Sequence, residues 1–139
     1  MEYISRKEFI SKAGLSAAAL LAPVCLGGLM SCSEDSVTPQ SGIDFTVDIS
    51  TGRLASNGGS LVKNGIIIAR TSTGDFLAVS AACTHEGATV NFVSSNSTFL
   101  CPRHGAKFSS TGSVISGPTN KNLAKYNTSV NGTTLRVFA

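Results

Sequence analysis

Apolar and polar residues alternate along several short segments of the chain, and this alternation predicts β-strands. Residues 43–49 (IDFTVDI) place four apolar side chains on one face. Residues 66–70 (IIIAR) form a continuous apolar run that predicts a buried strand. Residues 76–80 (FLAVS) and 98–101 (TFLC) predict two further strands, each leading into a cysteine. The regular part of the chain is therefore expected to be built from short strands.

Turn-forming residues separate these segments. Residues 57–65 (NGGSLVKNG) and 71–75 (TSTGD) are predicted to be turn-rich connections. Near the end, Asn131-Gly132 lies between two β-prone runs, which is a strong hairpin signal. No long amphipathic helical pattern follows residue 42, and the length of 139 residues suits one folded domain. The pattern predicts an all-β domain with many turns.

The first 31 residues are predicted to be an export signal. Arg6, Lys7 and Lys12 precede an uncharged stretch from Ala13 to Met30, which ends at small residues. A basic segment, an apolar segment and a small-residue cleavage site follow one another in this order in secretory signals. The alternative is an uncleaved membrane anchor, because the uncharged stretch is at the lower limit for a spanning helix.

Two features of this segment resemble known export motifs. Residues 5–12 (SRKEFISK) resemble the twin-arginine pattern, with Lys7 in place of the second arginine. Residues 29–32 (LMSC) resemble a lipobox, which implies that Cys32 is lipidated and is the first mature residue, although an ordinary cysteine remains the alternative. Residues 32–42 would then be a lipidated cysteine and a polar, flexible tether. The resemblance implies an exported, membrane-anchored bacterial protein on the periplasmic side, in the outer membrane or at the cell surface.

Charge excludes one class of partner. The formal net charge is +3, and outside the N-terminal signal eight basic and six acidic residues remain. These residues form no basic stripe, which nucleic-acid binding would require, so no nucleic acid is expected as a partner.

Both histidines and two of the four cysteines lie between residues 83 and 108. Cys83 and His85 are two residues apart, Cys101 and His104 are three apart, and each pair follows a predicted strand. Two thiolates and two imidazoles suit zinc or an iron–sulfur cluster. A disulfide between the cysteines is an alternative in an exported protein, but it would leave the histidines unexplained. The common order of zinc ligands, two cysteines from one element and two histidines from another, differs from this order.

The same residues resemble the signature of Rieske [2Fe–2S] proteins: C-x-H, fifteen intervening residues, then C-x-x-H, as in "CTHEG" and "CPRHGAKF". Downstream, "SGPTNKNLAKY" resembles the proline loop of the family, in which Gly117-Pro118 would cover the cluster and Leu123 follows. The resemblance implies a small Rieske-type antiparallel β-sandwich or barrel over residues 43–139. A cluster-binding lobe of loops is expected at about residues 80–120, with one [2Fe–2S] cluster.

The resemblance also assigns the ligands. Cys83 and Cys101 would bind the inner iron, and His85 and His104 the outer iron, with their imidazoles facing the surface. Replacing two thiolates by neutral imidazoles raises the reduction potential. Gly87 and Gly105 follow the ligand triplets, where the backbone would have to approach the cluster closely. A simple turn is the alternative reading for both glycines.

The chain departs from the Rieske subunits of quinol-oxidising cytochrome bc complexes at four positions. Those subunits have an extra cysteine in each loop, joined as a disulfide, where this chain has Ala88 and Arg103. They also have a serine and a tyrosine that hydrogen-bond the cluster, where this chain has Ala106 and Phe108. Fewer donors disfavour the reduced state, so we expect a low to middle potential within the Rieske range of about −150 to +300 mV. At these positions the chain is more similar to a Rieske ferredoxin.

These inferences lead to a membrane-tethered one-electron carrier that works with redox partner proteins and has no catalytic site of its own. One alternative is the Rieske subunit of a larger membrane-associated oxidoreductase acting on a quinol or a small inorganic substrate. Another is a structural zinc-binding lipoprotein. A single-chain Rieske oxygenase is excluded, because its mononuclear iron needs two further histidines and this chain has none.

Overall fold

The computed structural model describes residues 37–139. The predictions for the export signal, the lipobox and Cys32 lie outside the described residues. The described part is almost entirely antiparallel β-sheet, which confirms the predicted all-β class. Its elements are β1 Asp44–Asp48, the 3₁₀ helix η1 Gly52–Ala55, β2 Ser60–Lys63, β3 Ile66–Arg70, β4 Phe76–Ser80, β5 Asn91–Val93, β6 Thr98–Leu100, β7 Lys107–Phe108, β8 Val114–Ser116, β9 Asn127–Asn131 and β10 Thr134–Phe138.

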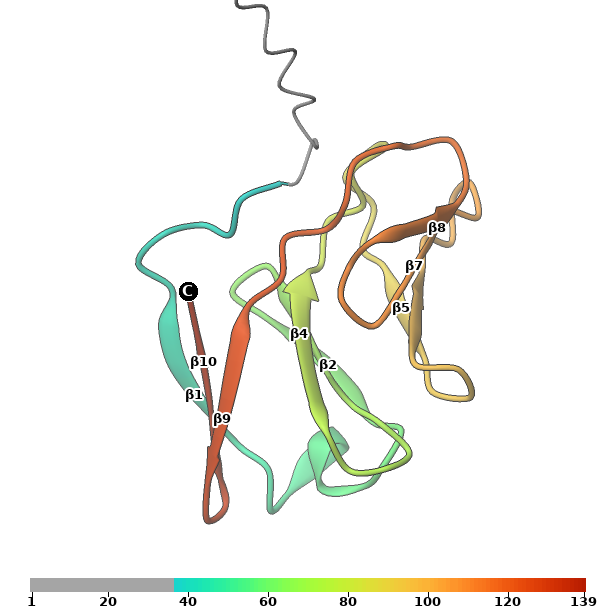
Figure 1. Cartoon of the computed structure of the whole chain (residues 1–139). Helices are drawn as coiled ribbons and strands as arrows, with labels where there is room; N and C mark the ends of the chain where they lie inside the picture. Colours follow the sequence, from blue (N-terminus) through green and yellow to red (C-terminus); the bar gives the residue numbers. More distant parts are fainter. Residues whose placement is uncertain (1–36) are drawn as a thin grey trace, which may run out of the picture. The chain divides into compact units, whose positions relative to one another are not determined.

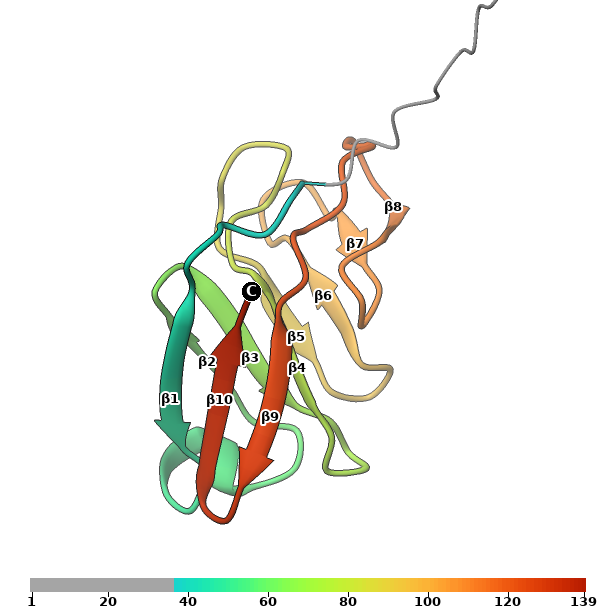
Figure 2. The ribbon, with the colours of Figure 1, turned by 60° about the vertical axis from the view of Figure 1, so that its left-hand side comes forward.

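The strands form three sheets, with the orders β1-β10-β9, β2-β3-β4 and β5-β6-β7-β8. Figure 1 shows the β2-β3-β4 sheet between the other two, and in Figure 2 this sheet lies behind the β1-β10-β9 sheet. The β1-β10-β9 and β2-β3-β4 sheets form a sandwich. The four-stranded sheet and the loops around it form a separate lobe, which we call the cluster lobe (residues 81–123). The expected lobe of loops thus contains a sheet of its own, which the pattern did not predict.

Strand β3 explains how the lobe is attached, because both of its faces are buried. Ile66 and Ile68 pack in the sandwich core, whose other members are Leu54, Ala78, Ala124, Tyr126, Leu135 and Val137. Ile67 and Ala69 pack in the lobe core, whose other members are Val79, Ala81, Cys83, Val90, Phe99, Cys101, Ala106, Phe108 and Leu123. A strand buried on both faces shows no alternation, so the continuous apolar run was correctly predicted to be a buried strand.

Two of the three Asn-Gly pairs, Asn64-Gly65 and Asn131-Gly132, differ from the prediction. Lys63 pairs with Ile66, so Asn64-Gly65 is a two-residue hairpin turn in which both residues have positive φ, 52° and 72°. Residues 60–63 are therefore a strand rather than part of a turn-rich connection. At the second pair Asn131 is still paired with Thr134, so the turn comprises Gly132 and Thr133, one residue later than predicted.

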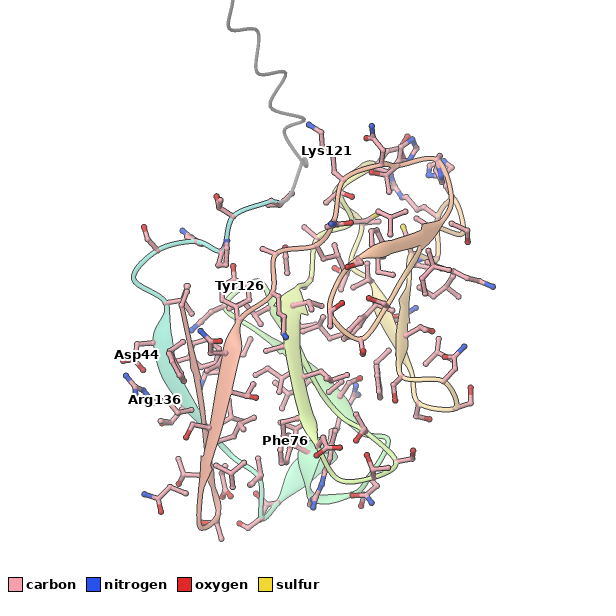
Figure 3. All side chains as sticks on the ribbon, viewed as in Figure 1. Asp44, Phe76, Lys121, Tyr126 and Arg136 are labelled. Atoms are coloured by element: carbon pink, nitrogen blue, oxygen red, sulfur yellow. The ribbon has the colours of Figure 1, made fainter. Side chains whose placement is uncertain are left out.

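The first strand is fastened to the last one. The carboxylate of Asp44 accepts hydrogen bonds of 2.8 and 2.6 Å from the guanidinium of Arg136, as Figure 3 indicates on neighbouring strands. These bonds hold the pKa of Asp44 below its usual value. Just before β1, the backbone N–H of Gln40 donates to the Tyr126 hydroxyl at 3.3 Å. The segment that leads into β1 is thus bonded to Tyr126, the residue before β9.

Candidate metal centre

The first predicted ligand pair lies in a loop of residues 83–88, which follows β4 and which we call the first loop. The Cys83 N–H donates to the Ala88 carbonyl at 2.8 Å, and the Gly87 N–H donates to the Cys83 carbonyl at 2.7 Å. These two bonds close the loop on itself. Cys83 is therefore held at the base of the loop, while His85 lies near its middle.

The second pair lies in residues 101–106, the second loop, which follows β6 and repeats the same hydrogen-bond frame. The Cys101 N–H donates to the Ala106 carbonyl at 2.8 Å, and the Gly105 N–H donates to the Cys101 carbonyl at 3.1 Å. In both loops a cysteine bonds to the alanine five residues later and accepts from the glycine four residues later. The sequence carries the same repeat, because residues 83–88 (CTHEGA) and 101–106 (CPRHGA) both have the order C-x-x-x-G-A.

The backbone geometry that the two loops share favours glycine at one position in each loop. Gly87 and Gly105 have φ values of 73° and 71°, a region that other L-residues rarely adopt. A Cβ placed on either residue would meet no protein atom within 4 Å. Within the protein itself, the requirement at both positions is conformational and does not arise from crowding.

Both cysteine side chains are buried, with 3% of Cys83 and 1% of Cys101 exposed, and both thiols are free. The Cys83 sulfur accepts hydrogen bonds from the backbone N–H groups of His85 and Glu86, and the Cys101 sulfur from those of Arg103 and His104. Burial raises the pKa of Cys83. Burial also acts to raise the pKa of Cys101, but the N–H donors and the neighbouring Cys83 thiol outweigh it and lower this pKa.

The two imidazoles are exposed and close to each other. The ring centroids of His85 and His104 are 4.8 Å apart, with the rings nearly perpendicular. Two buried sulfurs with N–H donors and two exposed imidazoles fit a [2Fe–2S] cluster, because the donors stabilise anionic sulfur and neutral nitrogen completes the coordination. The structure thus places the four predicted ligands in two loops at the same end of the antiparallel pair β5-β6, the first loop before β5 and the second after β6.

Glu86 and Arg103 add an ion pair that the sequence did not predict. The Glu86 carboxylate lies 3.5 Å from the Arg103 guanidinium and 3.6 Å from Nδ1 of His104. It therefore joins the first loop to the second, and its carboxylate lies within 4.8 Å of the imidazole nitrogens of both histidines. Arg103 stands where the cytochrome bc type has a disulfide cysteine, so an exposed ion pair links the loops here.

The proline loop, residues 116–123, contacts both of these loops. The Thr84 hydroxyl donates to the Lys121 carbonyl at 2.7 Å and shares a hydrogen bond of 3.0 Å with the Thr119 hydroxyl. Gly117 has a φ of 119°, and a Cβ there would lie 2.5 Å from the Cα of Ala106. Pro118 follows this close contact and is exposed. Sequence reasoning missed Thr84, because nothing near it indicates a partner 37 residues away.

Comparison with known proteins identifies the family. The family model of the Rieske [2Fe–2S] domain matches residues 44–127, which is more than half of the chain. The cytochrome b6-f complex iron–sulfur subunit of Chlorobaculum thiosulfatiphilum is 42% identical over 66 residues, covering 48% of this chain and 36% of that protein. The subunit of the same name from Synechococcus sp. (strain CC9605) is 44% identical over 52 residues, covering 37% and 29%. The chain thus matches about a third of the length of these relatives.

Solved structures agree with this assignment. The cyanobacterial plasma membrane Rieske protein from Synechocystis PCC 6803 is 34% identical, with a TM-score of 0.50, covering 58% of this chain and 85% of that one. The ferredoxin of carbazole 1,9a-dioxygenase from Nocardioides aromaticivorans IC177 shares the fold, with a TM-score of 0.52 at 23% identity, covering 60% and 86%. The chain therefore belongs to the Rieske [2Fe–2S] family and carries one [2Fe–2S] cluster.

Proposed function

We propose that this Rieske protein is a one-electron carrier whose cluster is held by Cys83, His85, Cys101 and His104. When bound, the cluster supplies a centre that accepts and releases one electron. The buried thiols hold one side of the centre away from water, and their backbone N–H donors stabilise negative charge on sulfur. The exposed imidazole pair provides the edge through which a redox partner protein exchanges the electron.

The observation that carries this proposal is the paired loop frame. Two loops with the same backbone hydrogen bonds place one buried thiol each beside an exposed imidazole, and the two imidazoles lie 4.8 Å apart. A zinc site is not favoured, because zinc has no redox chemistry and the family is that of an iron–sulfur domain.

Spectroscopy of the full chain, produced with iron–sulfur assembly machinery, tests the proposal. We expect two irons and two sulfides per chain, a visible spectrum that bleaches on reduction with dithionite, and an EPR signal of the reduced protein typical of a histidine-ligated cluster. A colourless protein that binds zinc even when iron and sulfide are supplied would contradict the proposal.

A second candidate function is favoured by the names of the relatives, which are subunits of the cytochrome b6-f complex. In that case the chain would be one subunit of a larger membrane-associated oxidoreductase, and a partner subunit would oxidise a quinol or a small inorganic substrate. Isolation of the protein from its own cells in mild detergent separates the two candidates. A carrier would be isolated alone, whereas a subunit would co-purify with partner subunits that contain haem or another metal cofactor.

We further propose that the protein is exported and held at a membrane by lipid on Cys32, on the periplasmic side or in the outer membrane. Residues 37–139 contain no helix that is both long and apolar enough to cross a bilayer. Support for the lipid comes from the lipobox-like sequence at residues 29–32. Several acyl chains at one cysteine anchor a protein stably.

Replacing Cys32 by alanine should move the protein from the membrane fraction to the soluble fraction, because the lipid attachment point is lost. Cell fractionation followed by immunoblotting measures this. Cys25→Ala is the matched control and should leave the protein in the membrane fraction. Membrane retention of the Cys32 variant would instead favour an uncleaved N-terminal anchor.

The potential should lie in the low to middle part of the Rieske range, because Ala106 and Phe108 are fully buried in the lobe core and carry no hydroxyl. Introducing the donors by the double variant Ala106→Ser/Phe108→Tyr should raise the midpoint by on the order of 59 mV, the equivalent of tenfold for one electron. Phe45→Tyr makes one of the same changes in the sandwich and should leave the midpoint unchanged. A midpoint of the unmodified protein above about +250 mV would contradict this account.

A further inference from the structure

The charged residues of the cluster lobe are unevenly signed. The cluster lobe, residues 81–123, contains three cations (Arg103, Lys107 and Lys121) and one anion (Glu86), a net charge of +2. The other described residues, 37–80 and 124–139, contain five cations (Arg53, Lys63, Arg70, Lys125 and Arg136) and three anions (Asp44, Asp48 and Asp75), also a net charge of +2. The cluster lobe therefore has three cations for its one anion, whereas the other described residues have fewer than two cations for each anion.

The three cations of the lobe lie in three different segments, each within or adjoining one of the two histidine loops. Arg103 precedes His104 in the second loop. Lys107 lies on β7, where it pairs with Ser116 beside the start of the proline loop. Lys121 is at the far end of the proline loop, where its carbonyl accepts the Thr84 hydroxyl, and Figure 3 shows its side chain pointing outward at this end of the lobe. All three side chains are exposed.

The one anion of this region does not cancel their charge. The Glu86 carboxylate is 3.5 Å from Arg103, so it offsets that guanidinium. Within residues 37–139, neither Lys107 nor Lys121 forms an ion pair. Three of the five cations elsewhere in the described residues are engaged: Arg136 binds Asp44, Lys63 donates to the Thr46 carbonyl, and Arg70 donates to the carbonyls of Leu54 and Ala55.

An exposed apolar side chain lies on the strand that pairs with the strand of Lys107. Ile115, on β8, is 55% exposed and lies one residue before Ser116, the pairing partner of Lys107. Apolar contact surrounded by charge is the usual composition of a transient protein interface, in which the apolar part adds affinity and the charges orient the partner. Free lysines around the electron exit would attract an anionic surface over roughly a Debye length, about 8–10 Å in physiological salt.

We propose that this end of the lobe is a docking surface for an acidic redox protein, recognised by Lys107, Lys121 and Ile115 around the imidazole pair. This inference rests on the proposed electron-carrier function and names the chemical class of its partner. Because charge complementarity acts mainly on the rate of encounter, the effect should appear in the association rate and decline with salt. A protein partner is preferred to anionic lipid, because Lys107 and Lys121 lie in segments that adjoin the two loops of the imidazoles through which an electron would leave.

Two inorganic oxidants of opposite charge report the sign of this surface. The full chain, reduced with dithionite and freed of excess reductant, is mixed in a stopped-flow instrument with ferricyanide, which is anionic, or with tris(phenanthroline)cobalt(III), which is cationic. One electron leaves the protein and converts iron(III) to iron(II) or cobalt(III) to cobalt(II). Between about 0.01 and 0.15 M salt we expect the ferricyanide rate to fall by tenfold or more and the cobalt rate to rise.

The double variant Lys107→Glu/Lys121→Glu should slow ferricyanide at low salt by about tenfold or more and reverse its salt dependence. Arg53→Glu/Lys63→Glu makes the same change of charge in the sandwich and should alter the rate less than twofold. The midpoint potential of each variant is measured so that a change in driving force is separated from a change in encounter. Equal effects of the two double variants would overturn the proposal.

A pair of c-type cytochromes of matched potential, one acidic and one basic, tests the class of partner. The acidic cytochrome should accept the electron at least tenfold faster at low salt, and Lys107→Glu/Lys121→Glu should remove the difference. Equal rates for both cytochromes would overturn the docking proposal, even if the inorganic oxidants respond to charge. Binding of the reduced chain to anionic phosphatidylglycerol vesicles in place of the acidic cytochrome would overturn it in favour of a lipid surface. If the chain carried no cluster, the proposed electron-carrier function would be wrong as well. Spectroscopy therefore establishes the presence of the cluster before any rate is measured.

Discussion

Serine at position 101 is expected to abolish the visible spectrum and the iron content of the protein. Cys101 is almost fully buried, and its sulfur accepts hydrogen bonds from the backbone N–H groups of Arg103 and His104. These donors stabilise a thiolate, and a serine hydroxyl does not ionise near neutral pH to replace it. Iron and sulfide assays of Cys101→Ser, produced with assembly machinery, should therefore show less than a tenth of the parent content.

The control for this loss is Glu86→Gln. The Glu86 carboxylate lies within 4.8 Å of the imidazole nitrogens of both histidines, yet the proposed ligand set does not include it. The glutamine variant should keep two irons and two sulfides. Equal loss of iron in both variants would require Glu86 to be a ligand. Retention of iron by Cys101→Ser would remove this thiol from the set. Far-ultraviolet circular dichroism of both variants separates loss of coordination from loss of the fold.

The second large effect is expected from Gly117→Ala. A methyl group there would lie 2.5 Å from the Cα and 3.0 Å from the Cβ of Ala106, and the backbone φ of 119° is unfavourable for alanine. Positive φ costs about 1–2 kcal/mol, and overpacking of a close contact costs a further 1–3 kcal/mol or so. The proline loop must move away from the second loop, so we expect a lower melting temperature and faster loss of the cluster to a chelator.

Gly132→Ala is the matched control, because it has the backbone strain without the contact. Its φ is 58°, and a Cβ would meet nothing within 4 Å. It should cost about 1 kcal/mol, which lowers the melting temperature of a domain of this size by roughly 4–8 °C. Its rate of cluster loss should match that of the parent protein. Similar rates in the two variants would mean that the proline loop does not protect the cluster.

The sequence predicted elements whose pattern spans five or more residues, and also the short strand β6, which leads into Cys101. Strands β1, β3 and β4 were predicted because their apolar residues face one or two cores. Strands β5, β7 and β8 contain only two or three residues each, too few to show a period, and were missed. Strand β2 was not predicted, because turn-forming residues lie on both sides of it. Its register depends on Asn64-Gly65, where both residues adopt positive φ.

The candidate site divides in a similar way. Unusual residue types in unusual spacing indicated Cys83, His85, Cys101 and His104, because cysteine and histidine are rare in this chain. The contacts that organise the loops were not predictable. The Thr84 bond to the proline loop joins residues 37 apart, and the Glu86–Arg103 pair joins common surface residues of two separate loops. Such contacts depend on tertiary structure and leave no local trace in the sequence.

The burial of both faces of strand β3 has a consequence for the way this protein unfolds. Because Ile66 and Ile68 are buried in one core while Ile67 and Ala69 are buried in the other, neither core can be exposed to water without uncovering this strand. The backbone amides of residues 66–69 should therefore exchange with deuterated water only through global unfolding, and they should be the slowest in the domain. Damage at the metal centre would then be transmitted to the far sandwich as reduced protection, so that the redox end and the structural end behave as one cooperative unit.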